Sequence, residues 1–278
     1  MKKIFALLIF LLSSVKLIAC SCEPPNQALE FFASKYVFIG TADSKVYSRD
    51  SLTYTITFKV LKHYKNGDLP RTLSFIVKSE GRYHGQFTSC DWGVEKNEQW
   101  LIYAHQGSGK LTFEYCSGNS RPLTLDNNLD PDSERLIAKS NGFEPSKYIF
   151  TRYQVGLTWF TLLSRVDSIF SKYRTKNSTA NRIFMVVDID ERGKLFSSRL
   201  AYHPKDFTEI TDSVFYFLIA DIRESRKAAN EPERDFLQLV CSVPKWPKLF
   251  VPNTNYPIKY RLHIQLTFTE NVSKFHYF

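Results

Sequence analysis

The stretch Leu17–Pro25 constrains this chain most, because an N-terminal targeting signal gives way there to a Cys-x-Cys motif. Lysines at positions 2 and 3 are followed by an apolar run over 4–19 that contains no acidic residue. That layout is typical of a secretory signal, and the run is too short for a membrane-spanning helix of about 20 apolar residues. We therefore expect a signal peptide over 1–19 and a mature chain that begins at Cys20.

Export determines how the five cysteines are interpreted, because compartments outside the cytoplasm are oxidising and favour disulfides. Four of them lie in the first half of the chain: Cys20, Cys22, Cys90 and Cys116. The fifth, Cys241, lies in the apolar run over 236–241, where we expect a small buried side chain rather than a reactive thiol.

The net charge argues against a nucleic-acid partner. The whole chain carries a formal charge of +9, and three of its lysines belong to the expected signal, so the mature chain carries +6. Its Lys and Arg residues are scattered among Asp and Glu without a polybasic run, and an exported protein rarely meets nucleic acid. We expect no nucleic-acid binding.

Short strands dominate the first half. After a helix-compatible segment over 27–34, alternating or continuous apolar patterns predict strands over 36–42, 52–61, 72–77, 99–104 and 110–115. An Asn-Gly pair and two glycines supply turns between them. Five strands of this length predict a small closed β-barrel, to which we assign residues 20–125.

The second half mixes helices and strands. We expect 126–180 to hold a linker with a short helix over 134–139, followed by an amphipathic helix over 155–173. The stripe of that helix is expected to pack in a core: Leu157, Phe160, Leu163, Val166, Phe170 and Tyr173. Strands are then predicted over 182–190, 195–202 and 260–268, and helices over 208–223 and 233–241. We therefore expect a second domain over 181–278, of α+β class with a small antiparallel sheet.

Four cysteines recur in a characteristic arrangement. Two form a Cys-x-Cys terminus followed by proline, a third follows Thr88-Ser89, and a fourth follows Glu114-Tyr115. The strand sequences around it are Phe38–Thr41, Phe58–Lys62 and Trp100–Ala104. Together these residues resemble the netrin-type module of the tissue inhibitors of metalloproteinases. The resemblance covers about 20–125 and implies a five-stranded barrel of oligonucleotide-binding (OB) type. It also implies two disulfides, Cys20–Cys90 and Cys22–Cys116.

The resemblance further implies a zinc-chelating terminus. In the inhibitors, the α-amine and carbonyl oxygen of the first cysteine bind the catalytic zinc of the protease, and the second side chain enters its specificity pocket. The matching residues here are Cys20 and Ser21. An α-amine has an unperturbed pKa of about 8, and zinc readily displaces its proton.

A lipid anchor is the competing interpretation of Cys20. The run Leu17-Ile18-Ala19-Cys20 matches the bacterial lipobox, in which the cysteine thiol is linked to diacylglycerol and the amine can be acylated. Lipidation consumes the thiol that the Cys20–Cys90 bridge needs, and acylation abolishes chelation, so the two interpretations exclude each other. The odd cysteine count and Leu17 favour the anchor, whereas the pairing pattern of the module favours the disulfide. Both stay open.

The runs Val186–Leu195, Ser242–Pro247 and Pro257–Leu262 resemble the C-terminal domain of the energy transducer TonB. The resemblance implies β-augmentation, in which an exposed edge strand pairs with a segment of a partner. The side chains expected on this docking edge are Tyr260, Leu262, Ile264, Leu266 and Phe268. The alternative is that the fold is reused only as a packing partner. Energy transduction itself is not expected, because the twelve prolines are not gathered in a spacer: only Pro24 and Pro25 are adjacent.

No sequence motif points to catalysis. The sequence contains neither a Gly-rich phosphate loop nor a His-Glu-x-x-His motif, and its six histidines are scattered. We interpret Asp188, Asp190 and Glu191 as part of a hairpin turn rather than a cation site. We expect no catalytic residue, no metal and no cofactor.

Our hypothesis is an exported, non-enzymatic binding protein of the bacterial cell envelope, located in the periplasm, lipid-anchored at the outer membrane or secreted. Its expected partner is another envelope protein. The alternative is an inhibitor of a zinc metalloprotease that acts through the amine and carbonyl of Cys20.

Overall fold

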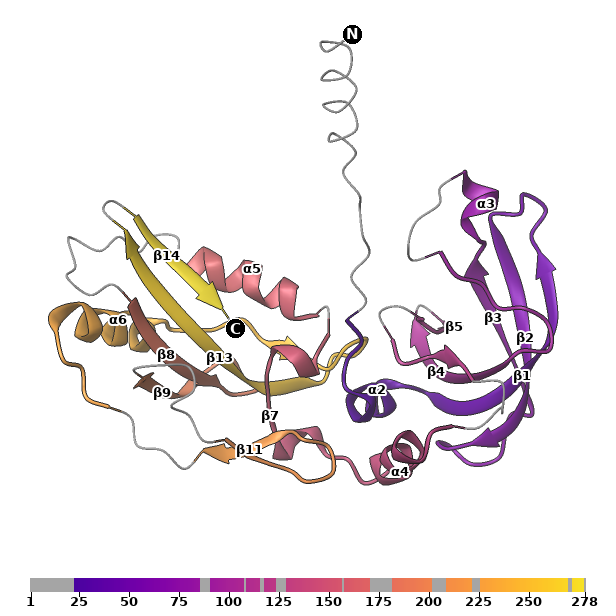
Figure 1. Ribbon diagram of the computed structural model, residues 1–278, viewed down its shortest axis with the longest axis horizontal. Helices are drawn as coiled ribbons and strands as arrows, with labels where there is room; N and C mark the ends of the chain where they lie inside the picture. Colours follow the sequence, from indigo (N-terminus) through magenta and orange to yellow (C-terminus); the bar gives the residue numbers. More distant parts are fainter. Residues whose placement is uncertain are drawn as a thin grey trace, which may run out of the picture.

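The computed structural model describes residues 23–85, 91–107, 109–115, 118–123, 129–156, 158–170, 182–201, 209–221, 226–269 and 272–277. The chain is mostly β, with two curled sheets and few helices. The two sheets lie on opposite sides of the molecule, and helices α2 (Gln27–Ala33) and α4 (Pro131–Ser140) lie between them (Figure 1).

The first sheet is antiparallel throughout. Its strands are β1 (Tyr36–Tyr47), β2 (Thr53–His63), β3 (Thr72–Lys78), β4 (Gln99–Gly107), β5 (Lys110–Thr112) and β6 (Arg121–Pro122). They pair in the order β3-β2-β1-β4-β5, and β6 adds to β4. In β2 the alternate residues Tyr54, Ile56 and Phe58 are buried, as the period-two pattern predicts. The five strands expected in this half are confirmed, except that the fifth ends at Thr112 rather than at residue 115.

The first sheet curls around its own core. The strand β1 shifts register between Ile39 and Gly40 and again after Ala42, and such irregularities bend a strand. Gly40 suits the bend, because a Cβ there would lie 3.1 Å from the Lys59 carbonyl oxygen. The curl encloses one apolar cluster: Phe38, Ala42, Tyr54, Ile56, Phe58, Leu73, Phe75, Val94, Trp100, Ile102, Ala104 and Phe113. The pairing path stays open between β3 and β5, which are its two ends.

The second sheet is mixed and centred on the long strand β13. Its strands are β7 (Ile149–Phe150), β8 (Arg182–Ile189), β9 (Leu195–Ala201), β10 (Glu209–Thr211), β11 (Leu218–Asp221), β12 (Leu249–Phe250), β13 (Pro257–Thr269) and β14 (Val272–Tyr277). They pair in the order β10-β11-β7-β13-β8-β9, and β12 and β14 also pair with β13. Only β7 and β13 run parallel among these pairs. The predicted strands at 182–190, 195–202 and 260–268 are confirmed.

Helices α5 (Thr158–Phe170) and α6 (Glu231–Ser242) contribute their apolar faces to the core of the second sheet. The buried residues of α5 are Trp159, Leu162, Val166 and Phe170. The predicted stripe is therefore correct from Leu163 onward, since Leu163 packs half-buried against this core and Val166 and Phe170 are buried, whereas Phe160 is 45% exposed and Trp159 takes its place. Leu157 and Tyr173 lie outside the described residues.

The helix predicted over 208–223 is wrong, because the chain forms β10, a turn and β11 instead. The Asp212 Oδ1 atom accepts hydrogen bonds from the amides of Val214, at 2.8 Å, and Phe215, at 2.6 Å, which stabilises a turn. Tyr216 then adopts a φ of +59°, which no helix residue adopts. Leu218 pairs with Ile149 of β7, so a sheet contact overrides the helical spacing.

Helix α2 is shared by two apolar clusters. Ala28 and Leu29 belong to the large core beneath the second sheet. Phe31 belongs to a smaller cluster that also contains Val37, Leu101 and Tyr103 of the first sheet and Ile137 of α4. The remaining short elements are α3 (Gly81–His84) and the 3₁₀ turns η1 (Pro145–Lys147) and η2 (Arg152–Gln154).

Lys65 closes the C-terminal end of α2. Its Nζ donates to the carbonyl oxygens of Phe31 at 2.6 Å, Phe32 at 2.9 Å and Ser34 at 2.6 Å. Burial lowers the pKa of Lys65 to about 8, while the three carbonyl oxygens favour its charged form. This contact ties the loop after β2 to the helix that both clusters share.

Candidate functional site

The residues predicted to act at the N-terminus lie outside the described part of the chain. They are Cys20, Ser21, Cys22, Cys90 and Cys116. Their disulfides, zinc chelation and lipidation therefore stay predictions. The structure describes the chain that follows Cys22 directly, beginning at Glu23.

Residues 23–26, the N-terminal segment, are held against the second half of the molecule. The Asn26 amide donates to the Gln154 carbonyl oxygen at 2.9 Å, and its Nδ2 donates to the Phe215 carbonyl oxygen at 3.3 Å. The Asn26 Oδ1 atom accepts from the Ala28 amide at 2.9 Å and so caps α2. Asn26 thus joins the segment to the start of a helix and to two loops of the second half.

Gly156 lies directly against the N-terminal segment. It has a φ of +59°, and a Cβ there would lie 2.6 Å from the Glu23 carbonyl oxygen and 3.0 Å from the Pro25 nitrogen. Glycine allows both the positive φ and the close approach of two backbones. The turn before α5 therefore supports the segment on one side.

A buried polar cluster supports the segment on another side. Glu30 of α2 is 2% exposed, and its carboxylate accepts from the backbone and side-chain amides of Asn119, both at 2.6 Å. The same carboxylate lies 3.1 Å from the His105 Nε2 atom. Asn119 Nδ2 also donates to the Pro25 carbonyl oxygen at 2.8 Å. A buried carboxylate is costly without such partners, so the Glu30 carboxylate holds Asn119 in place through these hydrogen bonds. Asn119 in turn holds the N-terminal segment through its hydrogen bond to Pro25.

This cluster joins the two chain segments that follow predicted disulfide partners. Pro25 comes three residues after Cys22, and Asn119 comes three residues after Cys116. Glu30 and Asn119 were not predicted from the sequence. The available signal was a single carboxylate with apolar neighbours on both sides in a short helix, which predicts a buried and partnered charge.

The predicted docking edge is not an edge. On one side β13 pairs with β8 from Tyr260 to Thr267, and on the other it pairs with β7 at Tyr260 and with β14 from Ile264 to Thr269. Four of the five expected contact residues are at most 1% exposed: Tyr260, Leu262, Ile264 and Leu266. The side chain of the fifth, Phe268, lies outside the described part. The alternation that suggested an exposed strand reflects a face packed on the core.

Next to β13, the open edge belongs to β14, and the ends of the pairing path are β9 and β10. Within the described residues, the outer side of β14 pairs with no strand. Its Lys274 and His276 side chains are exposed. Any strand added to this side of the sheet would therefore meet β14 rather than β13.

Cys241 is exposed, so the expectation that it is buried is wrong. The buried face of α6 consists of Glu233, Phe236 and Val240. Cys241 follows Val240 by one residue, which rotates its side chain about 100° away from that face. Its Sγ atom lies 3.7 Å from the Ser198 Oγ atom.

The hairpin-turn interpretation is confirmed for Asp190 and incomplete for Asp188. The Asp190 Oδ1 atom accepts from the amides of Arg192 at 2.9 Å and Lys194 at 2.7 Å. Asp188 is buried instead and binds Arg261 at 2.6 Å and 2.9 Å. Asp188 is therefore part of a buried ion pair inside the sheet.

No group of three or more His, Cys, Asp or Glu side chains is placed to hold a metal ion within the described part of the chain. No helix of the described ranges is both long and apolar enough to cross a bilayer.

Two comparisons with known proteins return no match. A scan against protein-family models finds none, and a search of curated proteins finds none.

Proposed function

We propose that this protein is an exported, non-enzymatic binding protein of the bacterial cell envelope, whose contact surface is built around the N-terminal segment. One observation carries the proposal. Residues 23–26 are fixed on two sides, by Asn119 from the first half and by Gln154 and Gly156 from the second. A segment that is ordered before its partner arrives avoids the entropy cost of becoming ordered on binding.

We also propose that the first half is a netrin-type barrel of OB class. The strand order β3-β2-β1-β4-β5 is that of a five-stranded barrel opened between β3 and β5. The hydrogen bond between Asn119 and Pro25 brings the chain after Cys116 close to the chain after Cys22. That proximity supports the proposed Cys22–Cys116 disulfide.

For the second half, a TonB-like arrangement is supported by contact between two of the segments that carry the resemblance. The Trp246 amide donates to the Gly193 carbonyl oxygen at 2.8 Å. A Cβ on Gly193 would lie 2.5 Å from the Trp246 carbonyl oxygen, so the hairpin turn and the Trp246 segment are in close contact. If this half docks a partner by β-augmentation, the described strands that offer an edge are β14 and the two ends of the pairing path, β9 and β10.

Inhibition of a zinc metalloprotease is the second candidate, and the same fixed segment favours it. Ligand atoms must lie within about 0.2 Å of their ideal distances from a zinc ion. A terminus at Cys20 would be three residues from the fixed Glu23, which restricts its position far more than a long tail would. If Cys20 carries a lipid instead, three residues span at most about 10 Å, so the folded body would lie close to the membrane surface.

The mass of the mature N-terminal peptide separates these two candidates. An unmodified amine, with Cys20 linked to Cys90, retains the inhibitor hypothesis. An added diacylglycerol or acyl group excludes it and favours the anchored binding protein. With a free terminus, one alanine inserted before Cys20 should abolish protease inhibition, because the amine moves by about 3.3–3.6 Å along the chain.

The contact surface is tested by photo-crosslinking in cells. A photoreactive residue at Pro24, which is exposed, should form an adduct with a discrete envelope protein. The control places the same residue at Leu61, which is 53% exposed on β2. Adducts at both positions or at neither, with the protein folded and exported, would contradict a contact surface at the N-terminal segment.

A further inference from the structure

Two aromatic side chains are exposed on the surface beside the N-terminal segment. Tyr153 lies in the 3₁₀ turn η2 and is 82% exposed, and Phe160 lies in the first turn of α5 and is 45% exposed. The Arg152 guanidinium lies 5.7 Å from the centre of the Tyr153 ring and 5.6 Å from that of the Phe160 ring. Because one guanidinium lies against both rings, the three side chains form a single patch, which we call the aromatic patch.

The backbone that carries Tyr153 is ordered by its own hydrogen bonds. Thr151 and Gln154 form a capping box across η2, in which the Thr151 amide donates to the Gln154 Oε1 atom at 2.8 Å. The Gln154 Nε2 atom donates to the Tyr216 carbonyl oxygen at 3.2 Å. The fold therefore presents the Tyr153 ring to solvent from a fixed turn.

The aromatic patch adjoins the point at which a lipid would anchor the chain. Tyr153 comes three residues before Gly156, and a Cβ on Gly156 would lie 2.6 Å from the Glu23 carbonyl oxygen. Cys20 in turn comes three residues before Glu23. Three residues span at most about 10 Å, so the patch and the anchor point each begin within about that distance of the contact between Glu23 and Gly156. A lipid on Cys20 would hold the patch close to the bilayer.

The charge of this part of the chain suits the phosphate groups of a lipid surface. Between Glu144 and Asp167 the sequence contains three basic residues and no acidic one. Lys147 pairs with Glu144 at 2.9 Å, whereas Arg152 forms no ion pair within the described ranges. A guanidinium binds phosphate oxygens through two parallel hydrogen bonds, and basic residues near an anionic membrane are attracted to it.

The shape of the patch also favours a bilayer over a protein partner. A protein would need a pocket that matches the protruding Tyr153 ring, whereas the fluid boundary between headgroups and acyl chains admits such a ring at any place. Side chains with an apolar body and a polar tip favour this boundary. Exposed aromatic and basic residues together are typical of surfaces that bind at it.

We propose that the aromatic patch contacts the lipid bilayer, with Tyr153 and Phe160 in the headgroup region and Arg152 on a lipid phosphate. The contact sets which face of the protein lies on the membrane. The proposal rests on the lipid-anchored form of the function proposed above, because the anchor at Cys20 is what brings the patch to the bilayer.

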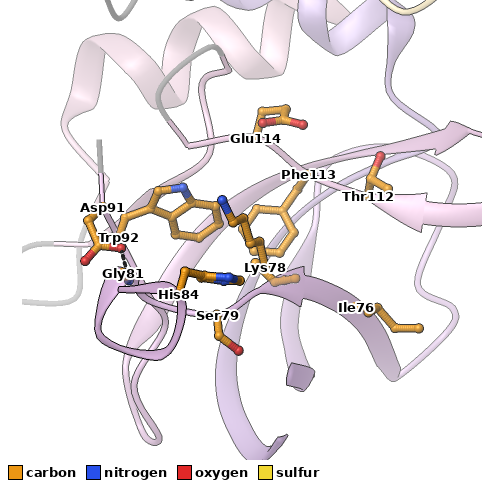
Figure 2. Close-up of a pocket in the computed structure, with 11 residues that line it drawn as sticks. Ile76, Lys78, Ser79, Gly81, His84, Asp91, Trp92, Thr112, Phe113 and Glu114 are labelled. Atoms are coloured by element: carbon orange, nitrogen blue, oxygen red, sulfur yellow. Dashed lines mark hydrogen bonds between the residues drawn. The ribbon is translucent and has the colours of Figure 1, made fainter. Parts of the chain in front are cut away.

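Fluorescence quenching by lipids tests the proposal. The full-length protein is purified from membranes and reconstituted into vesicles of phosphatidylethanolamine and phosphatidylglycerol with brominated acyl chains, which quench nearby tryptophan. Tyr153→Trp places a reporter on the patch, and Phe160→Trp places a second. Ile76→Trp is the matched control, because Ile76 is 54% exposed and Figure 2 shows it at the rim of the cavity between β3 and β5, in the other sheet.

The brominated lipids should quench the fluorescence that Tyr153→Trp or Phe160→Trp adds to that of the unsubstituted protein, and should not quench what Ile76→Trp adds. Arg152→Glu, combined with Tyr153→Trp, should reduce the quenching at position 153, because the new carboxylate is repelled by anionic lipid. Quenching at position 153 that is absent, or equal to that at position 76, would overturn the proposal.

The mass of the mature N-terminal peptide from the same preparation separates this proposal from the function on which it rests. An unmodified Cys20 would exclude the anchored form and the membrane contact together. A lipidated Cys20 without quenching at the patch would exclude the membrane contact alone. If a photoreactive residue at position 153 then forms an adduct with a discrete envelope protein in cells, the patch binds a protein instead of lipid.

Discussion

Replacing Gly156 with alanine should loosen the N-terminal segment and destabilise the fold for two separable reasons. The first is the φ of +59°, which costs a residue with a Cβ about 1–2 kcal/mol. The second is overlap, because the new Cβ would lie 2.6 Å from the Glu23 carbonyl oxygen. Overpacking of this kind typically costs about 1–3 kcal/mol. The two effects add to a loss of about 2–5 kcal/mol in the free energy of unfolding.

Gly67 provides the matched control. Its φ is +74°, and a Cβ there would meet no atom within 4 Å. Gly67→Ala should therefore show only the backbone cost of about 1–2 kcal/mol. The difference between the two variants isolates the contact of Gly156 with the segment.

Urea unfolding followed by tryptophan fluorescence gives the two losses of stability, and hydrogen exchange locates the damage. In Gly156→Ala the Asn26 amide, which donates to the Gln154 carbonyl oxygen, should exchange faster than in the unsubstituted protein. In Gly67→Ala it should not. Equal stability losses in the two variants, with unchanged exchange at Asn26, would refute the claim that this turn holds the segment.

Three further predictions concern other parts of the chain. Non-reducing peptide mapping should find Cys22 linked to Cys116, and Cys116→Ser should cost about 4 kcal/mol, because the bridge closes a loop of roughly 95 residues. Hydrogen bonds from Arg226 lower the pKa of Glu233, so its contribution to stability is complete above the unfolded pKa of about 4.3 and is lost as pH falls through the lower folded value. The difference in urea midpoint between the unsubstituted protein and Glu233→Gln should therefore be constant near pH 7 and shrink below about pH 4, and a constant difference would contradict the pairing. A thiol reagent should label Cys241 in the native protein, and Cys241→Ser should remove that label without loss of stability; no native labelling would show that this cysteine is covered.

The strands were predictable where the pattern of residues is local. In β2, Tyr54, Ile56 and Phe58 alternate with exposed or half-exposed residues, and this spacing alone identifies a strand with one buried face. The same spacing identified β13 but not its position in the sheet. A central strand and an edge strand show the same alternation when one face packs on a core, so the pairing of Ile264 with Tyr277 of β14 was not visible from the sequence.

The region after residue 208 shows where local patterns mislead. Ile210, Val214 and Leu218 recur at four-residue steps, which favour a helix. The chain instead makes a turn at Asp212, because Leu218 gains a strand partner in Ile149, 69 residues earlier. Pairing over such a distance depends on the folded chain and is absent from any short window of sequence.

The candidate site depends even more on distant contacts. The sequence pointed to the N-terminus through its cysteines, but the residues that hold the N-terminal segment come from three separate places. Asn119 is 89 residues from Glu30, and Gly156 has no sequence neighbour that signals its role. A glycine preceding a helix is common, and only the folded chain shows that the segment passes against it.

The position of α2 determines how the two halves lose their structure. Ala28 and Leu29 line the core of one sheet and Phe31 lines a cluster on the other, so melting either side strips apolar contacts from the same seven-residue helix. A helix of that length has almost no stability of its own in water. Unfolding should therefore spread from one half to the other as a single cooperative transition. Cleaving the chain after residue 125 would separate the two sheets in sequence. It would not give two independently folded halves, because helix α2 contributes apolar side chains to the cores of both.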